Sequence, residues 1–252
     1  MNRAVALAAK NLFFPQFCNS CGLRLLTEEN GYFCPTCWEL PLRIHRPFCT
    51  VCGRPHAGET GFGTQANFPC ARCRDRGPQP FRRIYGAAVY EGAIADAVKL
   101  LKFHDKPRLA RPLAEEMGEM AARELDCAAY NWIVPVPLHR VRGRERGFNQ
   151  AELLANALLP LFPNAQLSTA LGRIRPTRTQ SSIKDVHERT QNVRGAFAVD
   201  AEVSYAAGII VLIDDVVTSG GTVGECARAL TIAGAVAVDV LAAALPVELA
   251  SL

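Results

Sequence analysis

From residue 84 onwards, short apolar runs alternate with segments in which apolar residues recur every three or four positions. The apolar runs predict buried strands, and the helical spacing predicts helices between them. Strands that alternate with helices are typical of an α/β fold, in which helices cover both faces of a mostly parallel sheet. The expected strands are residues 84–90, 131–137, 195–200, 206–215 and 235–245, and the expected helices are residues 92–103, 111–126, 148–162 and 221–233.

The first eighty residues contain few core-forming runs, but they carry eight of the ten cysteines. These eight form four Cys-x-x-Cys pairs, with twelve, eleven and seventeen residues between successive pairs. A two-residue gap in a tight turn brings two thiolates to one metal ion, and zinc is held by four such ligands in a tetrahedron. We therefore expect a double zinc ribbon with two closed, structural zinc sites. The expected ligands are Cys18, Cys21, Cys34, Cys37, Cys49, Cys52, Cys70 and Cys73.

Disulfide bonds and a redox-active dithiol are the alternatives for these cysteines. Disulfides would require an oxidising compartment, and no export signal is recognisable, because Lys10 interrupts the apolar N-terminal stretch and no small-residue cleavage site follows. A thioredoxin-like dithiol would occur once, beside a strand–helix–strand pattern. We expect sequential pairing, with the first four cysteines on one zinc and the next four on another, although the spacing also permits a crossed arrangement. Since no apolar run is long enough to span a bilayer, we expect the protein in the cytoplasm.

Positive charge is concentrated in one stretch of the chain. The formal net charge is +4, and residues 140–194 contain ten Lys or Arg against four Asp or Glu side chains. Arginine outnumbers lysine in this stretch, which favours bidentate recognition of phosphates. A phosphate-rich ligand is therefore one interpretation, and a solvated basic surface is the other.

The stretch VLIDDVVTSGGTV, residues 211–223, joins an apolar strand to two adjacent carboxylates and a turn of small residues. Ligands of parallel sheets bind beyond the carboxyl ends of the strands, which is where Asp214 and Asp215 are expected. Backbone N–H groups in the turn, with the start of the next helix, would form an anion cradle that Gly220 and Gly221 let a ligand approach. Carboxylates beside a phosphate cradle suit a sugar phosphate. The alternative is an ordinary strand–helix turn with capping residues.

Residues 210–222, IVLIDDVVTSGGT, resemble the phosphoribosyl pyrophosphate (PRPP) loop of type I phosphoribosyltransferases. The resemblance implies that Asp214 and Asp215 bind the 2′ and 3′ hydroxyls of the ribose. It also implies that the loop binds the 5′-phosphate through Val217, Thr218, Ser219, Gly220, Gly221 and Thr222.

Two further segments are similar to the ComF/GntX branch of phosphoribosyltransferase-like proteins, whose members also carry an N-terminal cysteine-rich ribbon. The segments are IVPVPLHRVRGRERGFNQAELLA, residues 133–155, and RPTRTQSSIKDVHERTQNVRGAF, residues 175–197. The resemblance covers nearly the whole chain and implies two domains, an N-terminal helix and double zinc ribbon over residues 1–80 and a phosphoribosyltransferase-like domain over residues 81–252. It places Pro135, Val136 and Pro137 beside the diphosphate, and it makes Arg146, Arg175 and Arg178 the candidate catalytic residues. Ligand contact and a solvated surface both stay open for Arg142, Arg144 and Lys102.

The resemblance implies a glycosyl transfer in which an acceptor displaces pyrophosphate from ribose C1′, with Mg²⁺ bridging diphosphate and ribose oxygens. No set of residues indicates the acceptor, and the link to competence and DNA uptake comes from the resemblance alone. Two non-catalytic alternatives stay open. One is a single-stranded-DNA-binding component of DNA uptake or processing, and the other is a regulator that senses PRPP.

Overall fold

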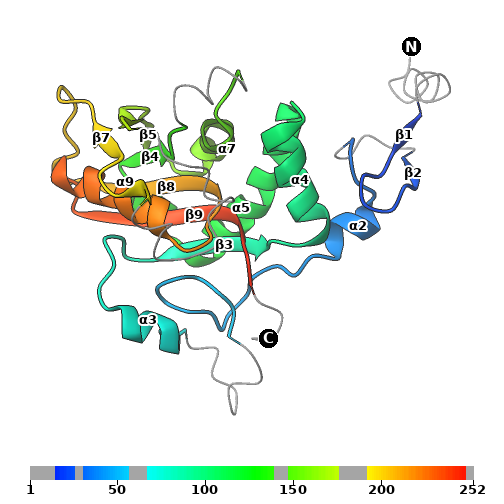
Figure 1. Cartoon of the computed structure of the whole chain (residues 1–252), viewed down its shortest axis with the longest axis horizontal. Helices are drawn as coiled ribbons and strands as arrows, with labels where there is room; N and C mark the ends of the chain where they lie inside the picture. Colours follow the sequence, from blue (N-terminus) through cyan, green and yellow to red (C-terminus); the bar gives the residue numbers. More distant parts are fainter. Residues whose placement is uncertain (1–14, 26–30, 57–66, 139–146, 176–191, 248–252) are drawn as a thin grey trace.

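The computed structural model describes residues 15–25, 31–56, 67–138, 147–175 and 192–247, and a sheet of five parallel strands lies at its centre (Figure 1). The strand order is β3–β9–β8–β4–β5. The predicted parallel sheet is therefore confirmed. The strands are β3 Ile84–Val89, β4 Trp132–Pro135, β5 Gln166–Leu167, β8 Ile209–Val216 and β9 Ala237–Leu245.

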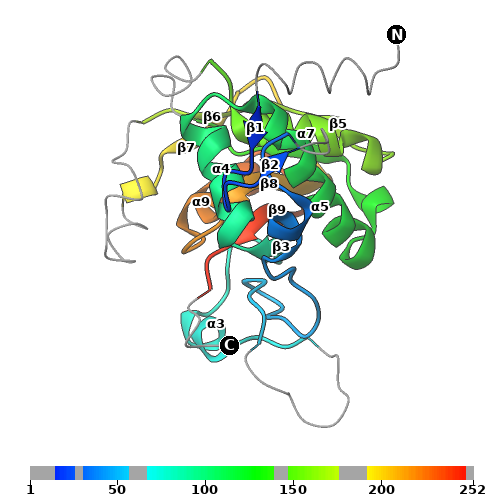
Figure 2. The same cartoon turned by 90° about the vertical axis from the view of Figure 1, so that its right-hand side faces the viewer.

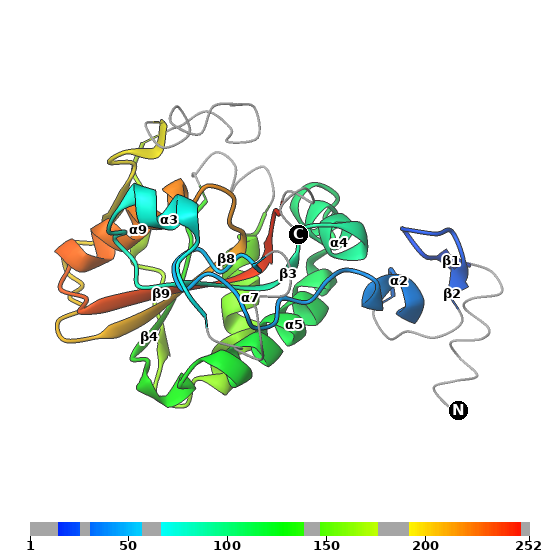
Figure 3. The same cartoon turned by 90° about the horizontal axis from the view of Figure 1, so that it is seen from below.

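Helices cover both faces of this sheet, as the sequence predicts. α5 packs against β3 and β9, α7 packs against β4 and β8, and α9 packs against β8 and β9. Figure 3 shows α9 on one side of the central strands and α5 on the other. The helices are α4 Gly92–Phe103, α5 Ala110–Glu124, α7 Gln150–Leu158 and α9 Gly221–Ile232, with short 3₁₀ turns η1 Pro107–Leu109, η2 Cys127–Ala129 and η3 Leu159–Leu161.

The central strands β8 and β9 are apolar along most of their length because helices cover them on both sides. Residues 210–213 and 240–244 are at most 1% exposed. The core continues into α5 and α7 through Leu113, Met117 and Leu154, each fully buried. Burying one such side chain stabilises the fold by roughly 1.5–3 kcal/mol, so the sheet is a firm platform for the polar residues at its carboxyl edge.

Strand β8 begins three residues later than the sequence predicts, at Ile209, and ends one residue later, at Val216. It continues through the two carboxylates to Val216, because β9 offers backbone partners that far, with Asp214 opposite Ala242 and Val216 opposite Ala244. Asp214 and Asp215 therefore lie in the final residues of the strand.

The strand expected at residues 195–200 is present as β7 Phe197–Val199, but it stays outside the parallel sheet. It pairs antiparallel with β6 Leu171–Arg173. A strand of three residues such as β6 is too short to show a period in the sequence. The two strands form a separate ribbon beside α9, which contacts both of them.

The cysteine-rich part lies along the free edge of the sheet. The segment between the two cysteine groups hydrogen-bonds to β3 through Ile44 N–H and the Ala87 carbonyl (2.9 Å), and the turn between Cys49 and Cys52 does so through the Val51 carbonyl and Ile84 N–H (2.9 Å). Figure 2 shows this segment passing beside β3. An edge strand is thereby covered and its backbone groups are paired. The elements of this part are β1 Gln16–Phe17, β2 Arg24–Leu25, α2 Pro35–Glu39 and α3 Ala71–Arg76.

Among the described helices, none has both the length and the apolar character that crossing a membrane requires.

Candidate functional site

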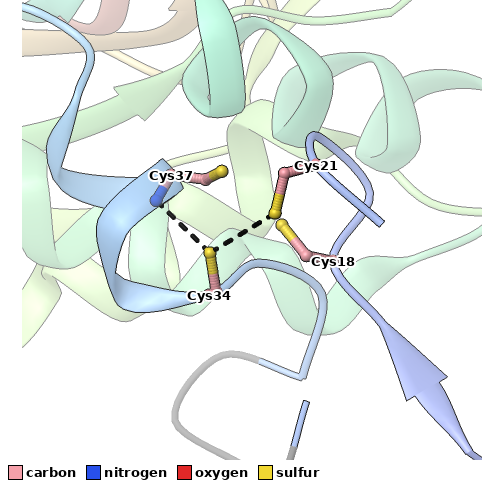
Figure 4. A group of neighbouring side chains, drawn as sticks. All are labelled: Cys18, Cys21, Cys34 and Cys37. Atoms are coloured by element: carbon pink, nitrogen blue, oxygen red, sulfur yellow. Dashed lines mark hydrogen bonds between the residues drawn. The ribbon is translucent and has the colours of Figure 1, made fainter. Parts of the chain in front are cut away.

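The first four cysteines converge on one point (Figure 4). The Sγ atoms of Cys18, Cys21, Cys34 and Cys37 all lie within 4.8 Å of one another, and the thiols are free. Cys21 Sγ lies 3.8 Å from Cys34 Sγ. Sulfurs around a tetrahedral zinc with bonds of about 2.3 Å would lie about 3.8 Å apart, so the donor set fits this ion.

The second group, Cys49, Cys52, Cys70 and Cys73, has the same arrangement, again with all Sγ atoms within 4.8 Å. Cys49 Sγ accepts backbone N–H groups from Val51, Cys52 and Cys70, with N···S distances of 3.3–3.5 Å. The hydrogen bond from the Cys52 thiol lowers the pKa of Cys49 to about 4, and these N–H groups help it against the effect of burial. Thiolates are the form that binds zinc. Sequential pairing is confirmed, and four thiolates at each site leave no open position.

At the carboxyl end of β8, Asp215 is almost completely enclosed, with 3% exposure. Its Oδ1 lies 2.8 Å from Lys102 Nζ at the end of α4 and accepts the Val216 N–H at 2.7 Å. Its Oδ2 accepts Gln150 Nε2–H from the start of α7 at 3.3 Å. Burial would lower the pKa of Lys102, but the charges of Asp215 and Asp214 outweigh it and raise that pKa. Asp215 is therefore held by the ammonium of Lys102 and the side-chain amide of Gln150.

Asp214 differs from its neighbour. Burial raises its pKa to about 8, the negative charge of Asp215 adds to the shift, and Lys102 opposes it. One ammonium thus serves two carboxylates, and Asp214 takes up a proton near neutral pH. Hydrogen-bond donors or a cation placed beside Asp214 would favour its charged form.

The loop between β8 and α9 offers hydrogen-bond donors. Gly220, the N-cap of α9, has a φ of 81°, in the left-handed region that favours glycine. Within the described ranges, the N–H groups of Thr218, Ser219 and Gly220 donate no hydrogen bond. The Ser219 Oγ is buried and likewise has no partner among the residues described. Such groups at a helix start suit an anion, so the residues expected to bind a phosphate lie together.

Residues 135–137, expected beside a diphosphate, lie beside the carboxyl end of β8. Pro135 stands opposite Ile213 in the neighbouring strand, and the Val136 N–H donates to the Ile213 carbonyl at 2.9 Å. Asn149, the N-cap of α7, donates through Nδ2 to the Val136 carbonyl at 3.1 Å. The segment is thus held at the same edge of the sheet as the acidic pair.

Of the candidate catalytic arginines, the structure describes Arg175. Arg146 and Arg178, like Arg142 and Arg144, lie outside the described residues. Arg175 donates through Nη2 to the carbonyls of Asn192 (3.2 Å) and Arg194 (2.8 Å). It thus joins the two ends of the segment 176–191, and its catalytic role stays a prediction.

Sequence reasoning left Lys102 undecided and missed Gln150. The structure brings both to Asp215, over 113 and 65 positions of the chain. Gln150 is only 4% exposed although it is polar. A glutamine directly after an N-cap asparagine gives no sequence signal of such burial, so only the packing of α7 on β8 reveals it.

Known proteins resemble both the cysteine-rich part and the α/β part of this chain. The family model of the double zinc ribbon domain matches residues 9–74. The DNA utilization protein YhgH of Salmonella typhi is 33% identical over 218 residues, which are 81% of this chain and 94% of the relative. The YhgH protein of Escherichia coli K12 is 32% identical over 232 residues, 91% and 96% of the two chains. The competence protein ComFC of Bacillus subtilis is 25% identical over 206 residues, 81% and 80%. The chain therefore belongs to the family of the DNA utilization protein YhgH and the competence protein ComFC.

Proposed function

We propose that the protein binds PRPP at the carboxyl edge of the sheet and acts as a phosphoribosyltransferase. One observation carries the proposal. Three backbone N–H groups without a partner among the described residues, and the buried Ser219 hydroxyl, lie shortly after a pair of carboxylates on the central strand. Donors for a phosphate and acceptors for sugar hydroxyls are thus spaced within a few residues, as a ribose 5-phosphate requires.

The two carboxylates have different tasks in this proposal. Asp215 already accepts from Lys102, Gln150 and Val216, so it fixes the geometry. Asp214 has the raised pKa, and ribose hydroxyls that donate to it would favour its charged form. The positive charge of Lys102 would offset the negative charge of the two carboxylates while a ligand approaches.

In the transfer, an acceptor nucleophile attacks ribose C1′, the bond from C1′ to the diphosphate oxygen breaks, and its electron pair leaves with pyrophosphate. The sugar carries positive charge in the transition state. The protein residues bind the ribose and the 5′-phosphate and hold C1′ in place while segment 135–137 lines the diphosphate side. Bound Mg²⁺ would neutralise the diphosphate charge, held mainly by ligand oxygens and water.

The names of the relatives support a task in DNA utilization or competence. We propose that the transfer or the bound PRPP serves DNA uptake or processing in the cytoplasm, with the ribbon over residues 1–80 and the ligand-binding domain over residues 81–252. Eight cysteines gathered into two zinc-type groups and not into disulfides accord with a reducing compartment.

A second candidate is a non-catalytic component that binds single-stranded DNA, and the same names favour it. Such proteins stack bases on exposed aromatic rings. In the ribbon, Phe33 is 3% exposed and packs on Trp38 at 5.7 Å, and Arg43 lies 5.9 Å from the Trp38 ring. Phe33 and Trp38 thus pack inside the ribbon, but Phe17 and Phe68 are 53% and 39% exposed and could stack on bases. The preference for the transferase therefore rests on the donors of the loop after β8 and not on the aromatic rings of the ribbon.

Isothermal titration with PRPP and Mg²⁺ tests the proposal. We expect saturable binding that Asp214→Asn removes and that Glu119→Gln, at an exposed position of α5, leaves unchanged. An intact protein that binds no PRPP would refute it. A screen of amines, nucleobases and oligonucleotides for pyrophosphate release then distinguishes transfer from binding alone.

A further inference from the structure

The ribbon touches the proposed phosphate loop with two arginines. Arg54 Nη2 donates to the Thr218 carbonyl at 2.8 Å, and Arg54 Nε donates to the Pro246 carbonyl at 3.2 Å. Arg76 Nη1 donates to the Ser219 carbonyl at 3.3 Å. The cavity that these residues line has a volume of about 20 Å³, room for about one water molecule. The interface is therefore a packed contact and not a ligand pocket.

Arg54 is held in place by the second cysteine group. Its carbonyl accepts the Cys49 N–H at 2.8 Å, which closes the turn that carries two of the thiolates. The turn itself is pressed on the edge strand, because a Cβ on Gly53 would lie 2.3 Å from the Ile84 carbonyl oxygen. Arg83 Nε adds a hydrogen bond to the Thr50 carbonyl at 2.9 Å. The guanidinium of Arg54 thus extends from a fixed point.

The direction of these contacts matters for the loop. In a planar trans peptide, the carbonyl of one residue and the N–H of the next point in opposite directions. A Thr218 carbonyl drawn toward Arg54 directs the Ser219 N–H away from the ribbon. A Ser219 carbonyl drawn toward Arg76 does the same for the Gly220 N–H. These are two of the N–H groups that donate to nothing else in the described ranges.

We propose that Arg54, assisted by Arg76, is a positioning residue for the phosphate seat, and that the second zinc group serves ligand binding by holding Arg54. This inference rests on the proposed function only in that the seat is filled by the phosphate of PRPP. The first cysteine group has a different contact, from Ser20 Oγ to Asp96 Oδ2 on α4 at 3.3 Å, and no hydrogen bond given for its described residues reaches the loop after β8. The ribbon therefore takes part in the site without touching the ligand.

The test compares Arg54→Met with Arg72→Met. Arg72 lines the same cavity and lies within the same cysteine group, between Cys70 and Cys73. It is exposed and has no hydrogen bond to the loop among those of the described residues, so it is the matched control. In the ligand-free protein, the amide order parameters of Ser219 and Gly220 should fall in Arg54→Met and stay at the wild-type value in Arg72→Met. Unchanged order parameters in Arg54→Met would overturn the inference whether or not PRPP binds.

Binding provides the second readout. Loss of a charged hydrogen bond should raise the dissociation constant for PRPP about ten-fold or more in Arg54→Met, with Arg72→Met like wild type. Millimolar guanidinium ion should restore part of the affinity of Arg54→Ala and none in Arg72→Ala, which a merely structural defect would not show. Wild-type affinity in Arg54→Met, with zinc content unchanged, contradicts the inference, whereas a wild-type protein that binds no PRPP contradicts only the proposed function.

Discussion

Removing the Lys102 ammonium tests the electrostatics of the site without any ligand. Lys102 Nζ lies 2.8 Å from Asp215 Oδ1, and the side chains are 22% and 5% exposed. Lys102→Met keeps the aliphatic stem and leaves two adjacent carboxylates without their cation. Breaking a buried ion pair in this way costs about 3–5 kcal/mol, and the partial exposure of Lys102 places the expected loss near about 3 kcal/mol at pH 9.

The loss should depend on pH in a defined direction. Lys102 lowers the pKa of Asp214, so its removal raises that pKa further above the unfolded value. A carboxyl whose folded pKa is raised loses stability as pH rises from its unfolded toward its folded pKa. The variant should therefore be closer to wild type at pH 5, where Asp214 is protonated, and least stable relative to wild type at pH 9.

Urea unfolding at pH 5, 7 and 9 measures this loss. At pH 9 the midpoint should fall by about 1 M for a loss of about 3 kcal/mol. Lys99→Met is the matched control, because Lys99 lies one turn earlier on α4, is 54% exposed and pairs only with Asp96 in the described ranges. If the two variants are equally stable at pH 9, or if Lys102→Met loses more stability at pH 5, the account of the acidic pair is wrong.

Three further expectations concern the acidic pair and the ribbon. Asp214→Asn removes the carboxyl whose pKa burial raises to about 8, so its melting temperature should exceed that of wild type at pH 9, and scanning calorimetry at pH 5 and 9 should show the gain shrinking at the lower pH. Gly53→Ala should lose about 1–3 kcal/mol more than Gly22→Ala in urea unfolding, because both glycines have φ near +70° but only at Gly53 would a Cβ clash; equal losses would mean that the ribbon is not pressed on β3. Metal analysis should find two zinc ions per chain and one in Cys52→Ser, and a ribbon that keeps its fold after chelation would contradict the two thiolate sites.

The main strands of the sheet could be predicted because buried strands consist of apolar residues. Central strands covered on both faces consist of continuous apolar residues, as in 209–213, and the spacing of the cysteines alone indicates two tetrahedral sites. The short strand β5 has two residues and, in the described part of the chain, pairs with β4 alone, so no period could reveal it.

The parts that could not be predicted depend on contacts between distant residues. Lys102 has the sequence surroundings of an exposed lysine at a helix end, and only the packing of α4 brings it to Asp215. Arg54 and Thr218 are separated by 164 positions, so nothing in either segment indicates that the ribbon supports the loop. The hydrogen bonds between the ribbon and the loop can be recognised only in the folded chain, in which the ribbon packs on β3.

The central claim is that the loop after β8 holds the phosphate of PRPP, and amide NMR during a PRPP titration tests it most directly. The largest changes in amide chemical shift should occur at Ser219 and Gly220, whose N–H groups donate to no described residue. The shifts of Gly208 and Gly234, which precede the amino ends of β8 and β9, should stay unchanged. A titration that leaves Ser219 and Gly220 unmoved, or that moves only residues elsewhere, would contradict the account.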